Sequence, residues 1–171
     1  MVKMNERKPS LRYYERIINR FAEKAQLLAA EAYSIFENEK EICKIIGVIV
    51  VHQATELALK ALCLQQENTI FQKGKVTIDF DTALQRCTNV IQFDEMILLK
   101  DLNGRRNDYQ HNALFDRSNF EDLRDLLLDT LAITSKILKH MGYATGEIDF
   151  ILDKENSLDN ENNTKLDMGV V

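Results

Sequence analysis

The apolar positions of this chain recur with helical spacing over three long segments. Over residues 10–37 they fall three or four positions apart for about seven turns, with charged side chains on the other face. The same spacing returns over 94–109 and over 118–141. Start and stop signals flank these segments: Ser10 and Asp94 as N-caps, a Ser118-x-x-Glu121 capping box, and Gly142 as the stop of the last helix.

Residues 41–66 show a different pattern, because apolar side chains cover most of the helix circumference. Gln53, Glu56 and Lys60 fall in one narrow polar stripe, with His52 at its edge. A helix that is apolar nearly all round is typical of the centre of a bundle. Its polar stripe must then face solvent, a partner or a polar site.

The remaining segments are shorter or polar. A turn signal over 72–75 is followed by a possible extended piece at 76–78, and Asp81 can cap a short helix that reaches about residue 90. Residues 1–9 are expected to be flexible, and the Asn-, Asp- and Glu-rich residues 151–171 to form a disordered tail. The sequence therefore predicts an all-α bundle of four to five helices over residues 10–150, with a short inserted helix and loop between the second and third main helices.

Composition narrows the possible functions. One proline and six glycines favour long helices, and the net charge of −5 argues against broad nonspecific binding to nucleic acid without excluding a local basic site. No metal-ligand cluster and no glycine-rich phosphate loop is present, so no metal and no cofactor is expected. The longest apolar run, 45–51, is short against the ~20 residues that cross a bilayer, which predicts a cytoplasmic protein without membrane contact.

The strongest candidate for chemistry is the stretch from Arg106 and Asn107 to His111. An arginine stabilises a developing phosphorane, a histidine transfers protons near neutral pH, and Asn107 can hold a phosphate oxygen or the imidazole. Such a set can cleave RNA without a metal, with the ribose 2′-OH as nucleophile. On an ideal helix, however, Arg106 and His111 lie about 140° apart. They converge only if the helix ends or distorts there, or if a second subunit supplies the partner; otherwise they are cations at a helix end.

This stretch, together with His52-Gln53-Ala54-Thr55-Glu56-Leu57-Ala58-Leu59-Lys60-Ala61-Leu62, resembles the HEPN superfamily. These are bundles of four or five helices found in prokaryotic toxins, abortive-infection and antiviral systems, with a motif of Arg, a polar residue and a His. The resemblance spans residues 10–142. It implies metal-independent endoribonuclease activity on RNA at a composite site between the two protomers of a homodimer. A cognate antitoxin or a nucleotidyltransferase-like protein is a possible partner.

Several further residues are candidates for supporting roles. Glu56 either pairs with Lys60 one turn away or orients Arg106 or His111, and Arg105 is an alternative motif arginine. Tyr109 either stacks on a base or packs in the bundle. Candidate RNA-contacting residues are the lysines Lys60, Lys73, Lys75 and Lys100, which otherwise are solvated charges.

Two other functions remain open from the sequence. One is a noncatalytic HEPN-like module that binds RNA, a nucleotide or a protein, favoured by the acidic net charge. The other is a helical dimerisation protein, which predicts no phosphate-bearing ligand.

Overall fold

The structure is a computed structural model that describes residues 11–67, 70, 77–112 and 120–167, and within these it is an all-α helical bundle. The predicted fold class is confirmed. The elements in chain order are α1 (Leu11–Phe36), α2 (Glu41–Glu67), α3 (Phe80–Arg86), α4 (Phe93–Asn107), the π-helical turn η1 (Asp108–Asn112), α5 (Phe120–His140) and α6 (Gly146–Asp167). No strand occurs among these residues, and the extended piece expected at 76–78 lies partly outside them.

The pairing of α1 with α2 is the most extensive contact of the bundle. The buried face of α1 carries small side chains at Ala22, Ala25, Ala29 and Ala32, all of them 0% exposed. Opposite them α2 carries Gly47, whose Cα lies so close to α1 that an added Cβ would be 2.9 Å from Phe36 Cβ. Small residues on both helices therefore allow the two backbones to approach closely.

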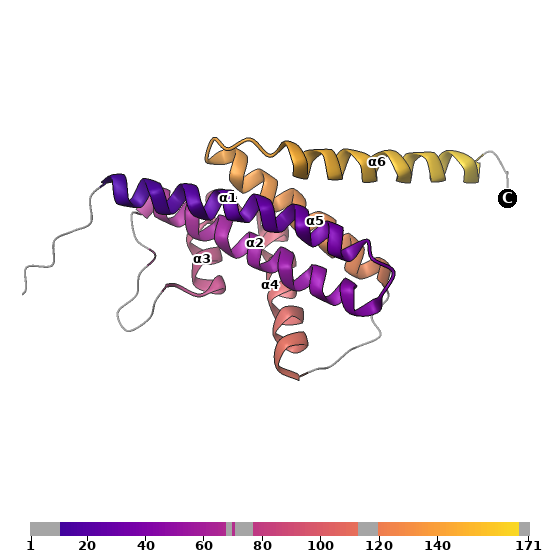
Figure 1. The fold of residues 1–171 in the computed structure, drawn as a ribbon, viewed down its shortest axis with the longest axis horizontal. Coiled ribbons are helices and arrows are strands. Elements are labelled where there is room, and N and C mark those ends of the chain that lie inside the picture. The colour runs from indigo at the N-terminus through magenta and orange to yellow at the C-terminus, as the bar shows by residue number, and fades with distance from the viewer. Residues whose placement is uncertain (1–10, 68–69, 71–76, 113–119, 168–171) are drawn as a thin grey trace, which may run out of the picture.

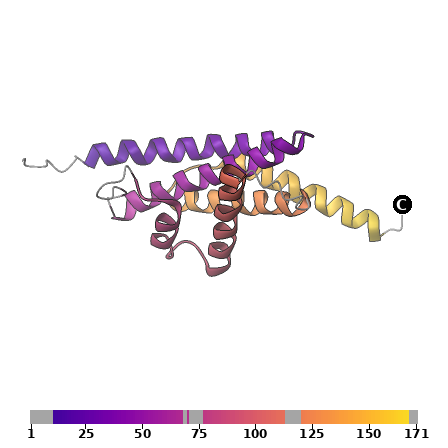
Figure 2. The same cartoon turned by 90° about the horizontal axis from the view of Figure 1, so that it is seen from below.

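The central position predicted for α2 is confirmed. It contacts α1, α3, α4 and α5, and in Figures 1 and 2 it runs beside α1 and α5 while α4 crosses their common long direction. Its buried Thr55 hydroxyl shares a 2.8 Å hydrogen bond with Thr134 of α5. Within the described residues α2 is also one helix long and apolar enough to cross a membrane, although half of that apolar window is buried in the bundle. The core helix of a soluble protein has the same composition.

Two helix starts differ from the prediction by a few residues. Asp79, rather than Asp81, caps α3, because its carboxylate accepts a 2.8 Å hydrogen bond from the Thr82 backbone N–H. At α4 the cap is Gln92, rather than Asp94, and the Gln92 backbone N–H donates to Glu95 at 2.7 Å. In both cases an extended residue further back in the chain takes the cap position. Ser10 and Ser118 lie outside the described residues.

The end of α5 is as predicted. Gly142 adopts a φ of 88°, which favours glycine, and the Tyr143 N–H donates to the Leu138 carbonyl at 3.0 Å. A second bond, from the Gly142 N–H to the Lys139 carbonyl, completes a Schellman motif. The chain then reverses into α6.

The expectation of a disordered tail from residue 151 is wrong as far as Asp167, because α6 continues that far. Ile151 and Glu155 of α6 are buried against the bundle, and Glu155 accepts hydrogen bonds from Tyr33 and Arg124. A buried carboxylate needs such partners, and here they come from α1 and α5. The polar composition that indicated disorder instead reflects a helix with only a narrow contact face.

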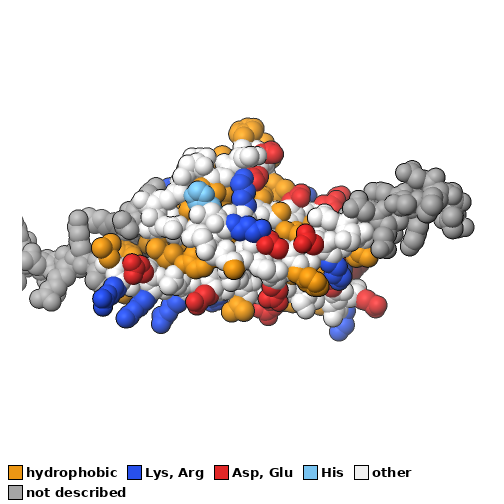
Figure 3. All heavy atoms as spheres, turned by 90° about the horizontal axis from the view of Figure 1, so that it is seen from above, with side chains coloured by type: hydrophobic (Ala, Val, Ile, Leu, Met, Phe, Trp, Pro, Cys, Tyr) orange, Lys and Arg blue, Asp and Glu red, His pale blue; other side chains and the backbone are white. Residues whose placement is uncertain are grey.

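The surface in Figure 3 carries both signs of charge and scattered apolar side chains. Among the exposed large apolar residues, Phe93 is 76% exposed and Ile97 55% exposed, and both lie on α4. They fall one helical turn apart, so they share one outward face of the helix.

Two glycine substitutions test the close packing of α1 on α2. Gly47→Ala gains helix propensity but places its Cβ against Phe36 and the Ala32 carbonyl, so we expect a loss of about 1–3 kcal/mol in the free energy of unfolding. Gly104→Ala in α4 meets nothing within 4 Å and should gain up to about 1 kcal/mol. Urea unfolding of both variants measures this. Equal and favourable effects of the two changes would contradict close contact at Gly47.

Candidate functional site

The candidate motif lies where α4 changes its helical geometry. Arg106 and Asn107 are the last two residues of α4, and His111 belongs to the π-helical turn that follows directly. An i→i+5 hydrogen-bonded turn brings positions five apart nearer to one face than the α-helical separation of about 140°. The backbone therefore departs from α-helical geometry at this point, which is one of the conditions under which the sequence spacing allows Arg106 and His111 to converge. The side chain of His111 lies outside the described part of the chain.

Arg106 is partly buried at this junction. Its Nη1 donates to Asn107 Oδ1 at 2.7 Å, so the first two motif residues hold each other. Its Nε is buried and has no hydrogen-bond partner among the described residues. An unsatisfied guanidinium N–H is costly in a folded chain, and it is a donor available to an acceptor that enters the site.

His52 of α2, which the sequence put at the edge of the polar stripe, is buried, with 1% of its surface exposed. Its Nε2 is 3.0 Å from Asn103 Oδ1, and Asn103 Nδ2 in turn donates to Asp81 at 3.2 Å. Because that amide oxygen can only accept, the hydrogen of the neutral ring belongs on Nε2. The lone pair is then on Nδ1, which is buried without a partner among the described residues. Phe80 stacks on the ring, with centroids 4.4 Å apart.

The environment of His52 favours its neutral form. Burial lowers its pKa below the ordinary value, and the positive charge of Arg106 lowers it further. The hydrogen bond to Asn103 and the carboxylates Glu56 and Asp81 oppose that shift without cancelling it. The hydrogen bonds from His52 to Asn103 and from Asn103 to Asp81 bring α2, α3 and α4 together at this position.

Sequence spacing gave no signal for this arrangement. His52, Asp81 and Asn103 are far apart in the chain and lie on three helices. The only local hint is that Asn103 precedes Arg106 by three residues and therefore lies on the same side of α4.

Glu56 takes the role of a structural ion pair. Its carboxylate is 2.6 Å from Lys60 Nζ, and Lys60 also donates to Thr77 at 3.0 Å. Lys60 is 8% exposed, so its ammonium group is largely used within the fold. The same pair lines a hollow of about 230 Å³ between α1 and α2, together with Lys24, Leu28, Gln53 and Leu57.

The other candidate residues have mixed placements. Arg105 forms a 2.8 Å ion pair with Asp101 and points to a different partner from Arg106. Tyr109 is half-buried and packs against the hydrophobic core, which is the second of the two roles expected for it. Lys100 is exposed on α4. Lys73 and Lys75 lie outside the described residues.

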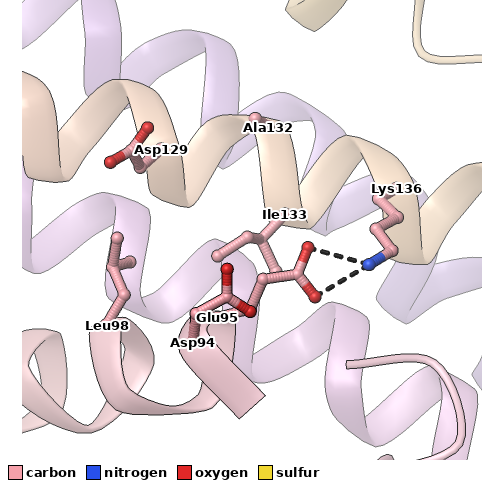
Figure 4. Close-up of a pocket in the computed structure, with 7 residues that line it drawn as sticks. All are labelled: Asp94, Glu95, Leu98, Asp129, Ala132, Ile133 and Lys136. Carbon is pink, nitrogen blue, oxygen red and sulfur yellow. Dashed lines mark hydrogen bonds and ion pairs between the residues drawn. The ribbon is translucent and has the colours of Figure 1, made fainter. Parts of the chain in front are cut away.

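A second hollow, of about 400 Å³, lies between α4 and α5. Figure 4 shows Glu95 reaching Lys136, whose Nζ is 2.8 and 2.7 Å from its two carboxylate oxygens. Asp94 and Asp129 add negative charge to this hollow. The pKa of Asp129 is raised by its burial and, to a smaller extent, by the negative charge of Asp125. This hollow is acidic and separate from the motif, which makes it unsuited to a phosphate.

Comparisons with known proteins identify no relative: no family model, no curated protein and no solved structure matches the chain. Among the residues that the structure describes, no group of His, Cys, Asp and Glu side chains is arranged to hold a metal ion.

The buried state of His52 gives a test by pH. Because its folded-state pKa is lowered, the unfolded chain binds the proton more readily, and stability is lost as the pH falls below about 6.5. His52→Gln removes this dependence, so its destabilisation relative to wild type should shrink by up to about 1.4 kcal/mol per pH unit on acidification.

Urea unfolding at pH 7.5 and at pH 5 measures this difference. The matched change at the exposed His140, His140→Gln, should affect stability little at pH 7.5. A His52→Gln destabilisation that is the same at both pH values would show that His52 is not held neutral.

Proposed function

We propose that this chain is a metal-independent endoribonuclease of the HEPN type, acting as a toxin or as an antiviral or abortive-infection effector. The observation that carries the proposal is the π-helical turn immediately after Arg106 and Asn107. It supplies the helix distortion that a motif of Arg and His five positions apart needs, at the position of that motif. π turns inside or beside α-helices are frequent at functional sites.

Each motif residue has a distinct role in this reaction. Arg106 offers guanidinium N–H donors to the non-bridging oxygens of the phosphate, and its charge stabilises the phosphorane. Asn107 holds the guanidinium in place through its 2.7 Å hydrogen bond. His111 accepts the proton of the ribose 2′-OH as that oxygen attacks phosphorus. The leaving 5′ oxygen takes a proton from the protonated imidazole of the partner subunit's His111 as its bond to phosphorus breaks.

A homodimer would complete the site, since one His111 cannot face both the attacking and the leaving oxygen at once. The support for a dimer is the outward face of α4, where Phe93 and Ile97 expose apolar surface one turn apart. In Figures 1 and 2, α4 extends away from α1, α2 and α5 and ends at the candidate motif. Pairing along α4 would bring two motifs together and collect their positive charge.

The remaining parts of the proposal concern setting and partners. RNA is the substrate, and a cognate antitoxin or a nucleotidyltransferase-like protein restrains the activity. The proposed location is the cytoplasm, supported by the burial of half of the apolar window of α2 in the bundle.

The activity is tested with single-stranded RNA in the presence of EDTA. We expect the wild type to cleave it, and Arg106→Ala and His111→Ala to lower the rate by about 10²–10⁴-fold while leaving the circular dichroism spectrum unchanged. His140→Ala, at the exposed end of α5, is the matched histidine control and should retain full activity. A substrate with 2′-deoxyribose at the cleavage position should resist.

Two outcomes would overturn the assignment. One is full cleavage by His111→Ala. The other is tight RNA binding by the wild type with no products in either EDTA or magnesium, which would favour a noncatalytic binding module.

The dimer has its own test. Ile97→Glu places a charge on the exposed face of α4, where it should leave the stability of the protomer unchanged within about 0.5 kcal/mol. We expect it to produce monomers in sedimentation velocity and to lower cleavage strongly. Lys100→Glu, which falls on the same helix closer to the motif, is less suitable because it also changes a candidate RNA contact. A variant at Ile97 that stays dimeric would place the interface elsewhere.

A further inference from the structure

The outward face of α1 carries a row of four cations, none of which is among the candidate site residues described above. Arg12, Arg16, Arg20 and Lys24 follow one another at intervals of four residues and are all exposed. We call this row the α1 basic stripe. It covers about 18 Å of helix at 1.5 Å per residue. Figure 3 shows Lys and Arg side chains in a row along the edge of the molecule next to the N-terminal segment drawn in grey.

The stripe opposes the electrostatics of its own helix. Like charges four residues apart repel one another, and cations near a helix N-terminus also oppose the helix dipole. The first turn of α1 contains no acidic residue to offset them. Among the described residues, no carboxylate forms an ion pair with any of the four cations. Glu15 and Glu23, three residues after Arg12 and Arg20, offset part of this repulsion, and the excess of positive charge favours an anionic ligand.

The distribution of charge along the chain reinforces this contrast. Residues 1–24 contain seven Lys or Arg and three Glu, a net charge of +4, while the whole chain has −5. The other residues therefore carry −9. An acidic protein with one concentrated basic region can still attract a polyanion to that region and repel it elsewhere.

The stripe also leads towards the candidate site. Because four residues fall about 40° beyond a full turn, the row winds by about 120° between Arg12 and Lys24. At Lys24 it reaches the hollow between α1 and α2 that is also lined by Glu56 and Lys60. Glu56, which lines this hollow, lies one helical turn after His52 on α2, and His52 is hydrogen-bonded to Asn103 of the helix that carries Arg106.

We propose that the α1 basic stripe binds the sugar–phosphate backbone of a single-stranded segment of the RNA substrate, outside the cleavage position. The proposal rests on the ribonuclease function proposed above. Tyr13, 49% exposed, lies on the same side of α1 as Arg16 and Arg20 and offers a ring on which a base can stack. A row of cations with an adjacent aromatic side chain is the combination that binds single strands without reading sequence.

The test separates binding from cleavage. Fluorescence anisotropy with an oligonucleotide of about 12 residues, made with 2′-deoxyribose so that it is not cleaved, gives the affinity at several salt concentrations. Each phosphate contact to a single strand contributes about 0.7 to the slope of log K against log salt concentration. Loss of two contacts in Arg16→Gln/Arg20→Gln should therefore reduce the magnitude of this slope by about 1.4, which corresponds to about 25-fold weaker binding at 0.1 M salt. Arg16→Lys/Arg20→Lys should restore most of the affinity.

The matched control removes the same number of charges elsewhere. Lys40→Gln/Lys154→Gln alters two exposed lysines, one just before α2 and one on α6, and should change neither the affinity nor its salt dependence. Equal weakening in both double variants would reduce the effect to net charge and overturn the proposal. So would unchanged binding by Arg16→Gln/Arg20→Gln, or binding of the wild type to phosphatidylserine vesicles in preference to the oligonucleotide.

Cleavage of a dinucleotide, too short to reach the stripe, distinguishes failure of this proposal from failure of the proposed function. Arg16→Gln/Arg20→Gln should cleave it with the wild-type kcat/KM. Wild-type activity on the dinucleotide with no loss of oligonucleotide binding in the variant rejects the stripe and keeps the ribonuclease. If the wild type cleaves no RNA but the double variant loses oligonucleotide binding, the stripe is supported and the ribonuclease function is rejected.

Discussion

The enclosure of α2 is the constraint on which the rest of the structure depends. A helix that is apolar nearly all round needs neighbours on several sides, and α1, α3, α4 and α5 all contact α2. The alanine row of α1 and Gly47 of α2 allow close approach in the most extensive of these contacts, that between α1 and α2. The surroundings of the buried polar residues of α2, His52, Thr55 and Lys60, are consequently set by the helices packed against it.

That enclosure explains the properties of His52. The ring is buried between Phe80 and Asn103, so its neutral form is favoured and its tautomer is fixed by the hydrogen bond at Nε2. Through Asn103 it is connected to α4, the helix whose last two residues are Arg106 and Asn107. The site thus depends on the core, because displacing α4 from α2 would remove the partner of His52 and move the motif arginine.

The surface of the molecule has an acidic region and a basic region on different helices. The acidic hollow between α4 and α5 contains Glu95 bound to Lys136 and repels phosphates. The basic stripe on α1 lies beside another hollow, which Glu56 and Lys60 line. Under the proposed function, the basic stripe would attract an RNA strand to the α1 side of the bundle, and this separation of charge would reconcile a net charge of −5 with a polyanionic substrate.

The sequence by itself determined the helices, the central place of α2 and the stop at Gly142, because hydrophobic periodicity and glycine preference are local properties. It also located the motif at the end of α4. Only the tertiary structure decided that His52 is buried against Asn103, that Glu56 pairs with Lys60, and that α6 extends through a polar segment. The burial of His52 and the extent of α6 depend on contacts between residues far apart in sequence. The sequence also left open whether Glu56 pairs with Lys60 or with a residue of the motif. The π turn after Asn107 likewise departs from the regular period that a sequence pattern assumes.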